Sequence, residues 1–144
     1  MFRQGGDVGI RATRWRLRWC QPPRGTRERP RFLLLKNLEI IEREGLVQRA
    51  THIGGLVSQA LHALHRDGLL KEVRGDGAVW AAGLHKQHDA MVVRDLALRN
   101  GAIVRGIGAD TNAFCPPLVT TDAELGRLMD AYASALHEHV KAVA

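Results

Sequence analysis

The residue pattern changes abruptly near Phe32, and this change is the first constraint on the fold. Beyond it, apolar residues recur at helical spacing along one amphipathic stripe, at Leu35, Leu38, Ile41, Val47, Ala50, Ile53, Val57, Ala60, Leu61 and Leu64. Before it, residues 1–31 have neither a helical nor a strand period, and three prolines interrupt them. The sequence therefore predicts two parts, a head at 1–33 and a globular domain at 34–144.

The head is also the source of the chain's net positive charge. It carries nine arginines against two acidic residues, whereas the rest carries 12 basic residues against 13 acidic ones. The arginines could contact phosphates while Trp15 and Trp19 stack on bases, or the segment could lie on a membrane surface, which Pro22-Pro23 disfavours. It could also be a plain basic tail, or a stretch of GC-rich gene read out of frame. We expect the head to be disordered or non-native.

The composition of the whole chain argues against several classes of protein. No stretch of 18 consecutive apolar residues is present, so no membrane-spanning segment is expected. Residues 1–18 contain no apolar signal region, and Cys20 and Cys115 are too few for a disulfide framework. These features predict a cytoplasmic protein.

Breaks in the pattern divide the domain into short elements. Gly45 separates two helices, Asp67-Gly68 ends the second, and Gly75-Asp76-Gly77 is expected to form the turn of a hairpin. The expected elements, in chain order, are helices to about 44 and over about 46–66, two strands flanking 75–77, a helix over about 89–99, strands at 102–105 and 111–115, and a last helix after 121. The fold class is therefore α+β, a small antiparallel sheet covered by helices.

The last helix has the clearest start signal. Thr121-Asp122-Ala123-Glu124 is a capping box, in which the Thr and Glu side chains each satisfy a free backbone amide. One side of the helix is apolar, comprising Leu125, Leu128, Met129, Tyr132, Leu136 and Val140.

The histidines, the cysteine Cys115 and the glycines of residues 75–77 are each candidates for a functional site, namely a metal site, a nucleophile and a dinucleotide loop. None of the three patterns is complete. Three histidine pairs occur, at 62/65, 85/88 and 137/139, without the third and fourth ligands that zinc requires. We therefore expect surface histidines and no metal site. Cys115 precedes two prolines in an apolar run, so a buried structural cysteine is expected. Residues 75–77 lack the G-x-G-x-x-G pattern of a dinucleotide loop.

Arg105 is the cation of most interest. It follows the apolar pair Ile103-Val104 and precedes the flexible segment 106–108. A guanidinium in this position could bind a carboxylate in bidentate fashion, or it could be an ordinary surface arginine at the end of a strand. The residues alone leave both interpretations open.

Five segments, in order and in spacing, resemble class III (omega-type) aminotransferases. They are 37–47 (NLEIIEREGLV), 73–77 (VRGDG), 101–105 (GAIVR), 114–118 (FCPPL) and 121–125 (TDAEL). The resemblance implies the C-terminal small domain of an enzyme of fold type I. Such enzymes use pyridoxal phosphate to move an amino group from an amine or amino acid to a keto acid or aldehyde. It also implies a homodimer with its active site between domains and subunits.

The same resemblance implies where the catalytic parts lie. The Schiff-base lysine and the phosphate cup belong to the large domain, and Lys36, Lys71, Lys86 and Lys141 match no catalytic position. No catalytic or cofactor-binding residue is therefore assigned here, and the chain alone is expected to be inactive, with an exposed apolar face where the large domain would pack.

Arg105 resembles the mobile arginine that binds the substrate carboxylate in omega-type members, which makes it the one substrate-binding residue that we assign. Ala109 adds a residue to the following loop, and Trp80 and Phe114 could line the domain interface, although neither is assigned as a substrate contact. The alternative function, from another class, is a non-catalytic α+β interaction module whose basic arm binds nucleic acid or another polyanion.

Overall fold

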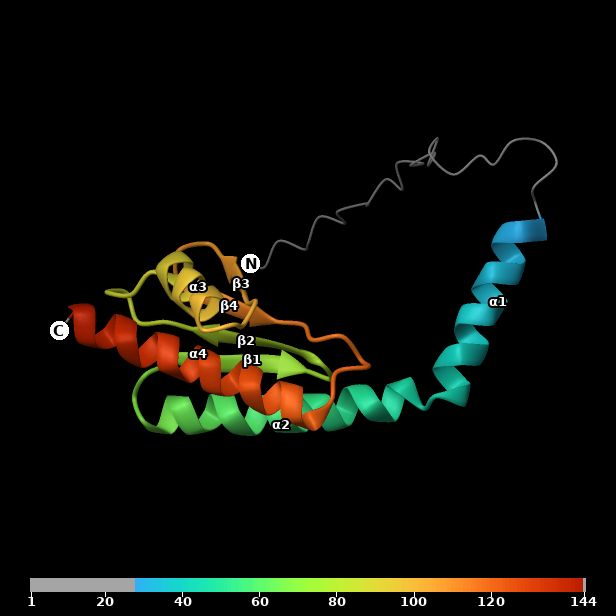
Figure 1. Cartoon of the computed structure of the whole chain (residues 1–144), viewed down its shortest axis with the longest axis horizontal. Helices are drawn as coiled ribbons and strands as arrows, with labels where there is room; N and C mark the ends of the chain where they lie inside the picture. The colour runs from blue at the N-terminus through green and yellow to red at the C-terminus, as the bar shows by residue number, and fades with distance from the viewer. Residues whose placement is uncertain (1–27, 144) are drawn as a thin grey trace, which may run out of the picture. The chain divides into compact units, whose positions relative to one another are not determined.

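The computed structural model describes residues 28–143, with side chains from residue 33 onward. It contains four helices and four strands: α1 (Glu28–Arg43), α2 (Leu46–Arg66), β1 (Glu72–Asp76), β2 (Val79–Gly83), α3 (Ala90–Arg99), β3 (Arg105–Ile107), β4 (Thr111–Phe114) and α4 (Asp122–Val143) (Figure 1). The predicted α+β class and element order are confirmed. Of the head at 1–33, for which disorder was expected, residues 1–27 lie outside the described part, whereas residues 28–33 belong to α1.

Helix α1 begins earlier than the sequence pattern predicted. It starts at Glu28 and includes Pro30, so this proline does not interrupt the helix as the sequence predicts. Proline is tolerated in the first turn of a helix, because its missing N–H has no intrahelical partner there. The chain divides into two compact units after Leu38, so α1 is described by itself.

The four strands form one antiparallel sheet in the order β1-β2-β4-β3. In the first hairpin Asp76 pairs with Val79, so the turn consists of Gly77 and Ala78. This corrects the predicted turn, because Gly75 and Asp76 belong to β1. The tight two-residue turn needs a positive φ at its first position, and Gly77 supplies it with a φ of 50°.

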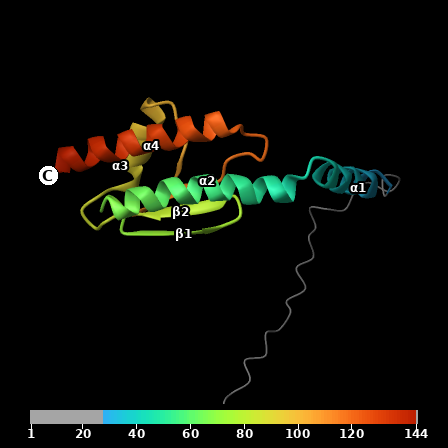
Figure 2. The ribbon, with the colours of Figure 1, turned by 90° about the horizontal axis from the view of Figure 1, so that it is seen from below.

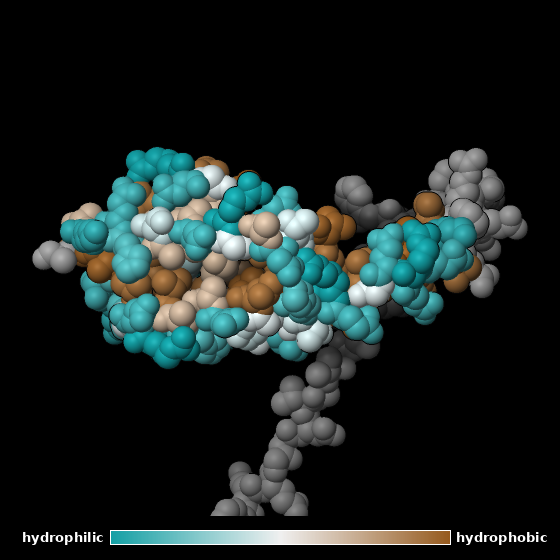
Figure 3. Space-filling view, turned by 60° about the horizontal axis from the view of Figure 1, so that its bottom comes forward, coloured by the Kyte–Doolittle hydropathy of each residue, from teal (hydrophilic) through white to brown (hydrophobic). Residues whose placement is uncertain are grey.

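All three remaining helices cover the same face of the sheet. Helix α2 packs on β1 and β2, α3 packs on β3 and β4, and α4 packs on α2 and α3. In Figure 2 both α2 and α4 lie on one side of β1 and β2. The surface on the side shown in Figure 3 is mostly hydrophilic, with small apolar areas between polar side chains.

The core lies between the helices and this covered face. Ile53, Val57 and Leu61 of α2 are fully buried, as the helical stripe predicted. On α4, Leu125 and Leu136 are buried, and Tyr132 stands edge-on to Phe114 with ring centroids 4.8 Å apart. Phe114, which could have lined the domain interface, is therefore a core residue.

A buried polar network runs through this core. Asn112 of β4 has no exposed surface. Its amide Nδ2 donates to the backbone carbonyl of Ala90 (2.9 Å), and its Oδ1 accepts from the Tyr132 hydroxyl (3.3 Å). Burial raises the pKa of Tyr132, so this hydroxyl keeps its proton and remains a donor. The network joins β4, α3 and α4.

Strand β3 lies later in the chain than the predicted strand at 102–105. It begins at Arg105, which pairs with Ala113. Residues 102–104 lie outside the ladder. If the register continued to Ala102, this residue would lie opposite Pro116, and proline cannot extend a ladder. The backbone N–H of Ala102 instead donates to the carbonyl of Ala97, closing the end of α3 (2.8 Å).

Within residues 28–143, no helix has the length and apolar character needed to cross a membrane.

The close approach of α2 to the hairpin turn at Gly54 gives a stability prediction. A Cβ at Gly54 would overlap the carbonyl oxygen of Gly77, so Gly54→Ala is expected to lower the free energy of unfolding by about 1–3 kcal/mol through overpacking. The neighbouring Gly55→Ala is the matched control, because a Cβ there meets nothing within 4 Å. It should stabilise α2 by up to about 1 kcal/mol. Urea unfolding of the full chain measures both, and equal effects would contradict the proposed helix–hairpin contact.

Candidate functional site

Arg105 is the first residue of β3, an edge strand of the sheet, and its side chain is exposed. Within residues 28–143 its guanidinium makes no hydrogen bond or ion pair. All five of its N–H donors are therefore available to a ligand.

The strand register places Arg105 on the open face of the sheet, opposite the helices. Alternate residues face opposite sides of a strand, and the neighbouring Gly106 lies against Met91 of α3 on the covered side. Across the sheet, Arg105 pairs with Ala113, Ala113 with Ala81, and Ala81 with Arg74. This open row therefore has an arginine at each end and two small side chains between.

The two arginines of the row differ in their partners. Arg74 forms an ion pair with Glu72 on its own strand, whereas Arg105 has none in the described part of the chain. A guanidinium that already holds a carboxylate is less available for another. Arg105 is thus the better candidate for a carboxylate-bearing ligand.

The turn that follows Arg105 is anchored to the covered side. The carbonyl of Ala109 accepts from the backbone N–H of Ala90 (2.8 Å), and that of Asp110 accepts from Leu84 (2.7 Å). Gly108 has a φ of 63°, which few other residues adopt. The extra residue Ala109 is therefore part of a turn held by α3 and the end of β2.

A shallow apolar depression adjoins the start of β3. It lies between the loop before this strand, the segment after β4 and the first turns of α4, and its shared lining is Ile103, Pro117, Thr120, Glu124 and Leu128. Ile103 is 84% exposed and nearby Val119 is 78% exposed. These side chains are exposed and apolar, and the packing of a large domain on such a face stays a prediction.

Cys115 lines the same depression and is exposed, which corrects the prediction that it is buried. Phe114 faces the core, so strand alternation turns the next residue to the opposite side. The apolar run had suggested burial on both faces.

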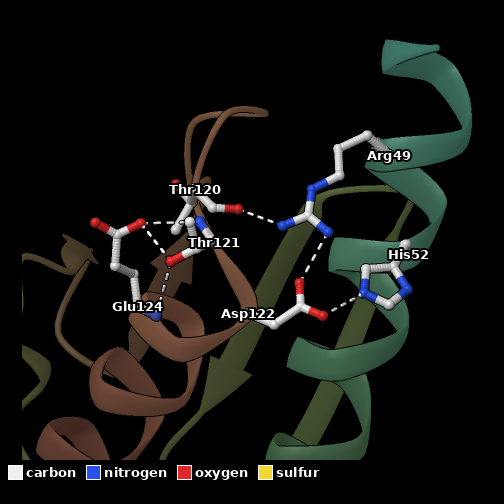
Figure 4. Close-up of polar contacts among 6 residues, drawn as sticks. All are labelled: Arg49, His52, Thr120, Thr121, Asp122 and Glu124. Atoms are coloured by element: carbon white, nitrogen blue, oxygen red, sulfur yellow. Dashed lines mark hydrogen bonds and ion pairs between the residues drawn. The ribbon is translucent and has the colours of Figure 1, made fainter. Parts of the chain in front are cut away.

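A polar cluster at the start of α4 was missed by sequence reasoning. Arg49 donates to the Asp122 carboxylate (2.8 Å) and to the Thr120 carbonyl, and His52 Nε2 lies 2.9 Å from the other Asp122 oxygen (Figure 4). The hydrogen bond from His52, then that from Arg49, holds the pKa of Asp122 below its usual value. Partners some 70 residues apart leave no local signal in the sequence.

The predicted capping box is present beside this cluster. The backbone N–H and hydroxyl of Thr121 both donate to Glu124 Oε2 (2.8 Å each), and the Glu124 N–H donates back to the hydroxyl (3.3 Å). The backbone hydrogen bond, followed by the hydroxyl one, lowers the pKa of Glu124. Together, the cluster and the box fix the segment that leads from β4 into α4.

All the histidines were predicted to lie on the surface, but only some of them do. His62, His65 and His137 are exposed, but His88 and His139 are buried, with ring centroids 5.2 Å apart. Among the described residues, no group of three or more potential ligands could hold a metal ion.

Lysine positions test whether this part of the chain could hold a Schiff-base cofactor. Within residues 28–143 the four lysines, Lys36, Lys71, Lys86 and Lys141, are all exposed, and none lines the depression. A lysine that forms a Schiff base is normally activated by desolvation or by a neighbouring cation. The described residues therefore do not fit pyridoxal phosphate by themselves.

Comparison with known proteins decides the family. Residues 32–136 match the family described as aminotransferase class-III. The chain belongs to the class III aminotransferases. Members of this family are pyridoxal-phosphate-dependent enzymes, and the predicted resemblance is confirmed.

The chain is also similar in sequence to individual aminotransferases. The L-lysine-epsilon aminotransferase of Mycobacterium tuberculosis is 37% identical over 102 residues, which are 69% of this chain and 22% of that protein. The probable mitochondrial ornithine aminotransferase of Caenorhabditis elegans is 30% identical over 93 residues, 65% of this chain and 22% of that protein. The chain thus spans about a fifth of the length of these relatives.

Solved structures of omega transaminases share the fold of this domain. The omega transaminase from Pseudomonas jessenii in complex with PMP superposes with a TM-score of 0.70 at 32% identity. The match covers 76% of this chain and 26% of that one.

The lowered pKa of Asp122 gives a prediction with a defined sign. A carboxylate whose pKa is lower in the folded protein than in the unfolded chain stabilises the fold at any pH above the unfolded-state pKa. This contribution is lost as the pH falls through the folded-state pKa. Asp122→Asn should therefore lower stability at neutral pH, and the difference from the wild type should shrink below about pH 4. Denaturant unfolding across this pH range measures it.

Asp130→Asn is the control, because the exposed Asp130 side chain on the same helix makes no hydrogen bond within residues 28–143. A deficit for Asp122→Asn that is independent of pH, or that matches Asp130→Asn, would contradict the role of the cluster.

Proposed function

We propose that this chain supplies the substrate-recognition domain of a class III aminotransferase, with Arg105 as the group that binds the substrate carboxylate. One observation carries the proposal: Arg105 is exposed on the open face of the sheet and has no partner within residues 28–143. The substrates would be an amino donor and a keto acid or aldehyde acceptor, as in other family members.

The geometry suggests how one arginine serves two kinds of substrate. A guanidinium at the edge of the sheet can form two parallel hydrogen bonds to a carboxylate. The alanines beside it, Ala113 and Ala81, leave space on the open face into which the side chain can turn away. An apolar substrate group could then occupy the region while the guanidinium remains in contact with solvent.

In this proposal the residues that bind the cofactor lie outside residues 28–143. The lysine and the phosphate-binding groups would lie in a large domain, and the active protein would be a cytoplasmic homodimer. The exposed lysines of residues 28–143 support this division of labour, because none occupies a desolvated position. We propose that the 144-residue chain alone does not transaminate.

The role of Arg105 is tested in a complete aminotransferase polypeptide that carries residues 34–144. Arg105→Ala should raise KM for a keto-acid acceptor roughly 10- to 100-fold, because a charge-assisted interaction of about 1.5–3 kcal/mol is lost. KM for an amine without a carboxylate should change little. Steady-state kinetics with both substrates measure the split.

Arg74→Ala is the matched control for this experiment, since Arg74 is the other exposed arginine of the same row. If both variants raise KM equally, or if Arg105→Ala affects both substrates equally, a specific carboxylate contact is ruled out.

The division of labour is tested with the chain as it stands. After incubation with pyridoxal phosphate and gel filtration, the chain should retain no cofactor absorbance and no transaminase activity. Reading the DNA upstream of codon 34 in all three frames should reveal a large domain. Retained cofactor would refute the division, whereas salt-dependent binding to DNA or RNA with no upstream large domain would favour the polyanion-binding alternative.

A further inference from the structure

Three histidines gather where the loop between β2 and α3 meets α4. The ring of His88 lies 5.2 Å from that of His139, at an angle of 68°, and 6.4 Å from that of His85. His88 and His139 retain 9% and 7% of their exposed surface. The proposed function uses none of the three.

The hydrogen bonds at this cluster suit neutral rings. His139 Nε2 accepts from the backbone N–H of Asp89 (3.3 Å), so this nitrogen carries no proton. His88 Nδ1 is the one buried side-chain polar atom of the described residues that has no partner. A proton on His139 Nε2 would place two N–H groups against each other, and a second proton on His88 would add repulsion between rings.

The neighbouring charged groups offer no compensation for such protons. The Asp89 carboxylate accepts from the Met91 N–H (2.7 Å) and caps α3. On α4, Glu138 faces Arg99 at 3.8 Å, and His137 is exposed. His85, on the same loop, lies 3.2 Å from the Gly68 carbonyl and adds a further cation when protonated.

We propose that His88 and His139 form a pH-sensitive latch that fastens the C-terminal half of α4 to the loop at residues 85–89. The latch is closed while both imidazoles are neutral and opens when they are protonated. It does not depend on the function proposed above.

The direction of the pH effect follows from the burial of His88. Desolvation, then the charges of His139 and His85, lowers the pKa of His88 from its usual 6.5. The unfolded chain therefore binds the proton more readily. The stabilising contribution of neutral His88 is complete above the pKa that it has in the unfolded chain. It is lost as the pH falls toward the pKa that it has in the folded protein.

Opening of the latch would reach the strand that carries Arg105. The loop ends at Asp89, the N-cap of α3, and the next residue, Ala90, donates its N–H to the carbonyl of Ala109 (2.8 Å). Ala109 lies in the turn between β3 and β4. Release of the loop therefore loosens one of the two backbone hydrogen bonds that hold this turn.

The first test compares the pH dependence of unfolding for the full chain and its variants between about pH 8 and pH 5. The wild type should lose stability as the pH falls, and His88→Leu, which cannot be protonated, should lose most of that slope. His137→Gln is the control, since His137 is an exposed histidine on the same helix, and it should keep the wild-type slope. A His88→Leu variant with the full wild-type slope would overturn the proposal.

The second test uses the wild-type chain and needs no variant. Imidazole NMR should show His88 titrating below 6.5, and amide hydrogen exchange, corrected for its intrinsic pH dependence, should accelerate on acidification at 85–90 and 136–143 but not at 53–61. Titration of His88 at or above 6.5, or uniform acceleration along the chain, would refute the latch.

Discussion

Burial of Asn112 is the constraint on which the arrangement of this domain depends. A primary amide without exposure is costly unless its donors and acceptor find partners. Here the partners are the carbonyl of Ala90, at the start of α3, and the hydroxyl of Tyr132, in the middle of α4. Both helices must therefore sit at defined positions over β4. The edge-on contact of Phe114 with Tyr132 reinforces the same placement from the next inward-facing position of the strand.

This arrangement leaves the two faces of the sheet with different tasks. The covered face is filled by helices and requires close approaches, such as Gly54 against Gly77 and Gly106 against Met91. The open face carries the row in which Ala81 and Ala113 lie between Arg74 and Arg105. Within residues 28–143 the edge arginine Arg105 has no partner, and this is the observation on which its proposed role in binding a substrate carboxylate rests. The family assignment is consistent with that interpretation.

Much of the fold could be predicted from local pattern. The helical stripe of α2, the capping box of α4 and the proline pair after β4 each act through near neighbours, so their signals are visible in the sequence. Errors arose where the signal was ambiguous. The apolar run around Cys115 did not reveal which side of the strand faced the core. Helix α1 begins at Glu28, about one turn before the start that Pro30 indicated. The placement of Arg105 on an unobstructed face needed the strand register.

The sequence by itself determined the order of helices and strands, the α+β class and the likeness to class III aminotransferases, because helix periods, caps and turns depend on residues close together in the chain. The tertiary structure alone decided which side chains meet across long separations. It brought Arg49 and His52 to Asp122, buried Asn112 between two helices and set His88 against His139. These contacts arise from packing elements on one face of a sheet, and no local pattern encodes which residues will face each other there.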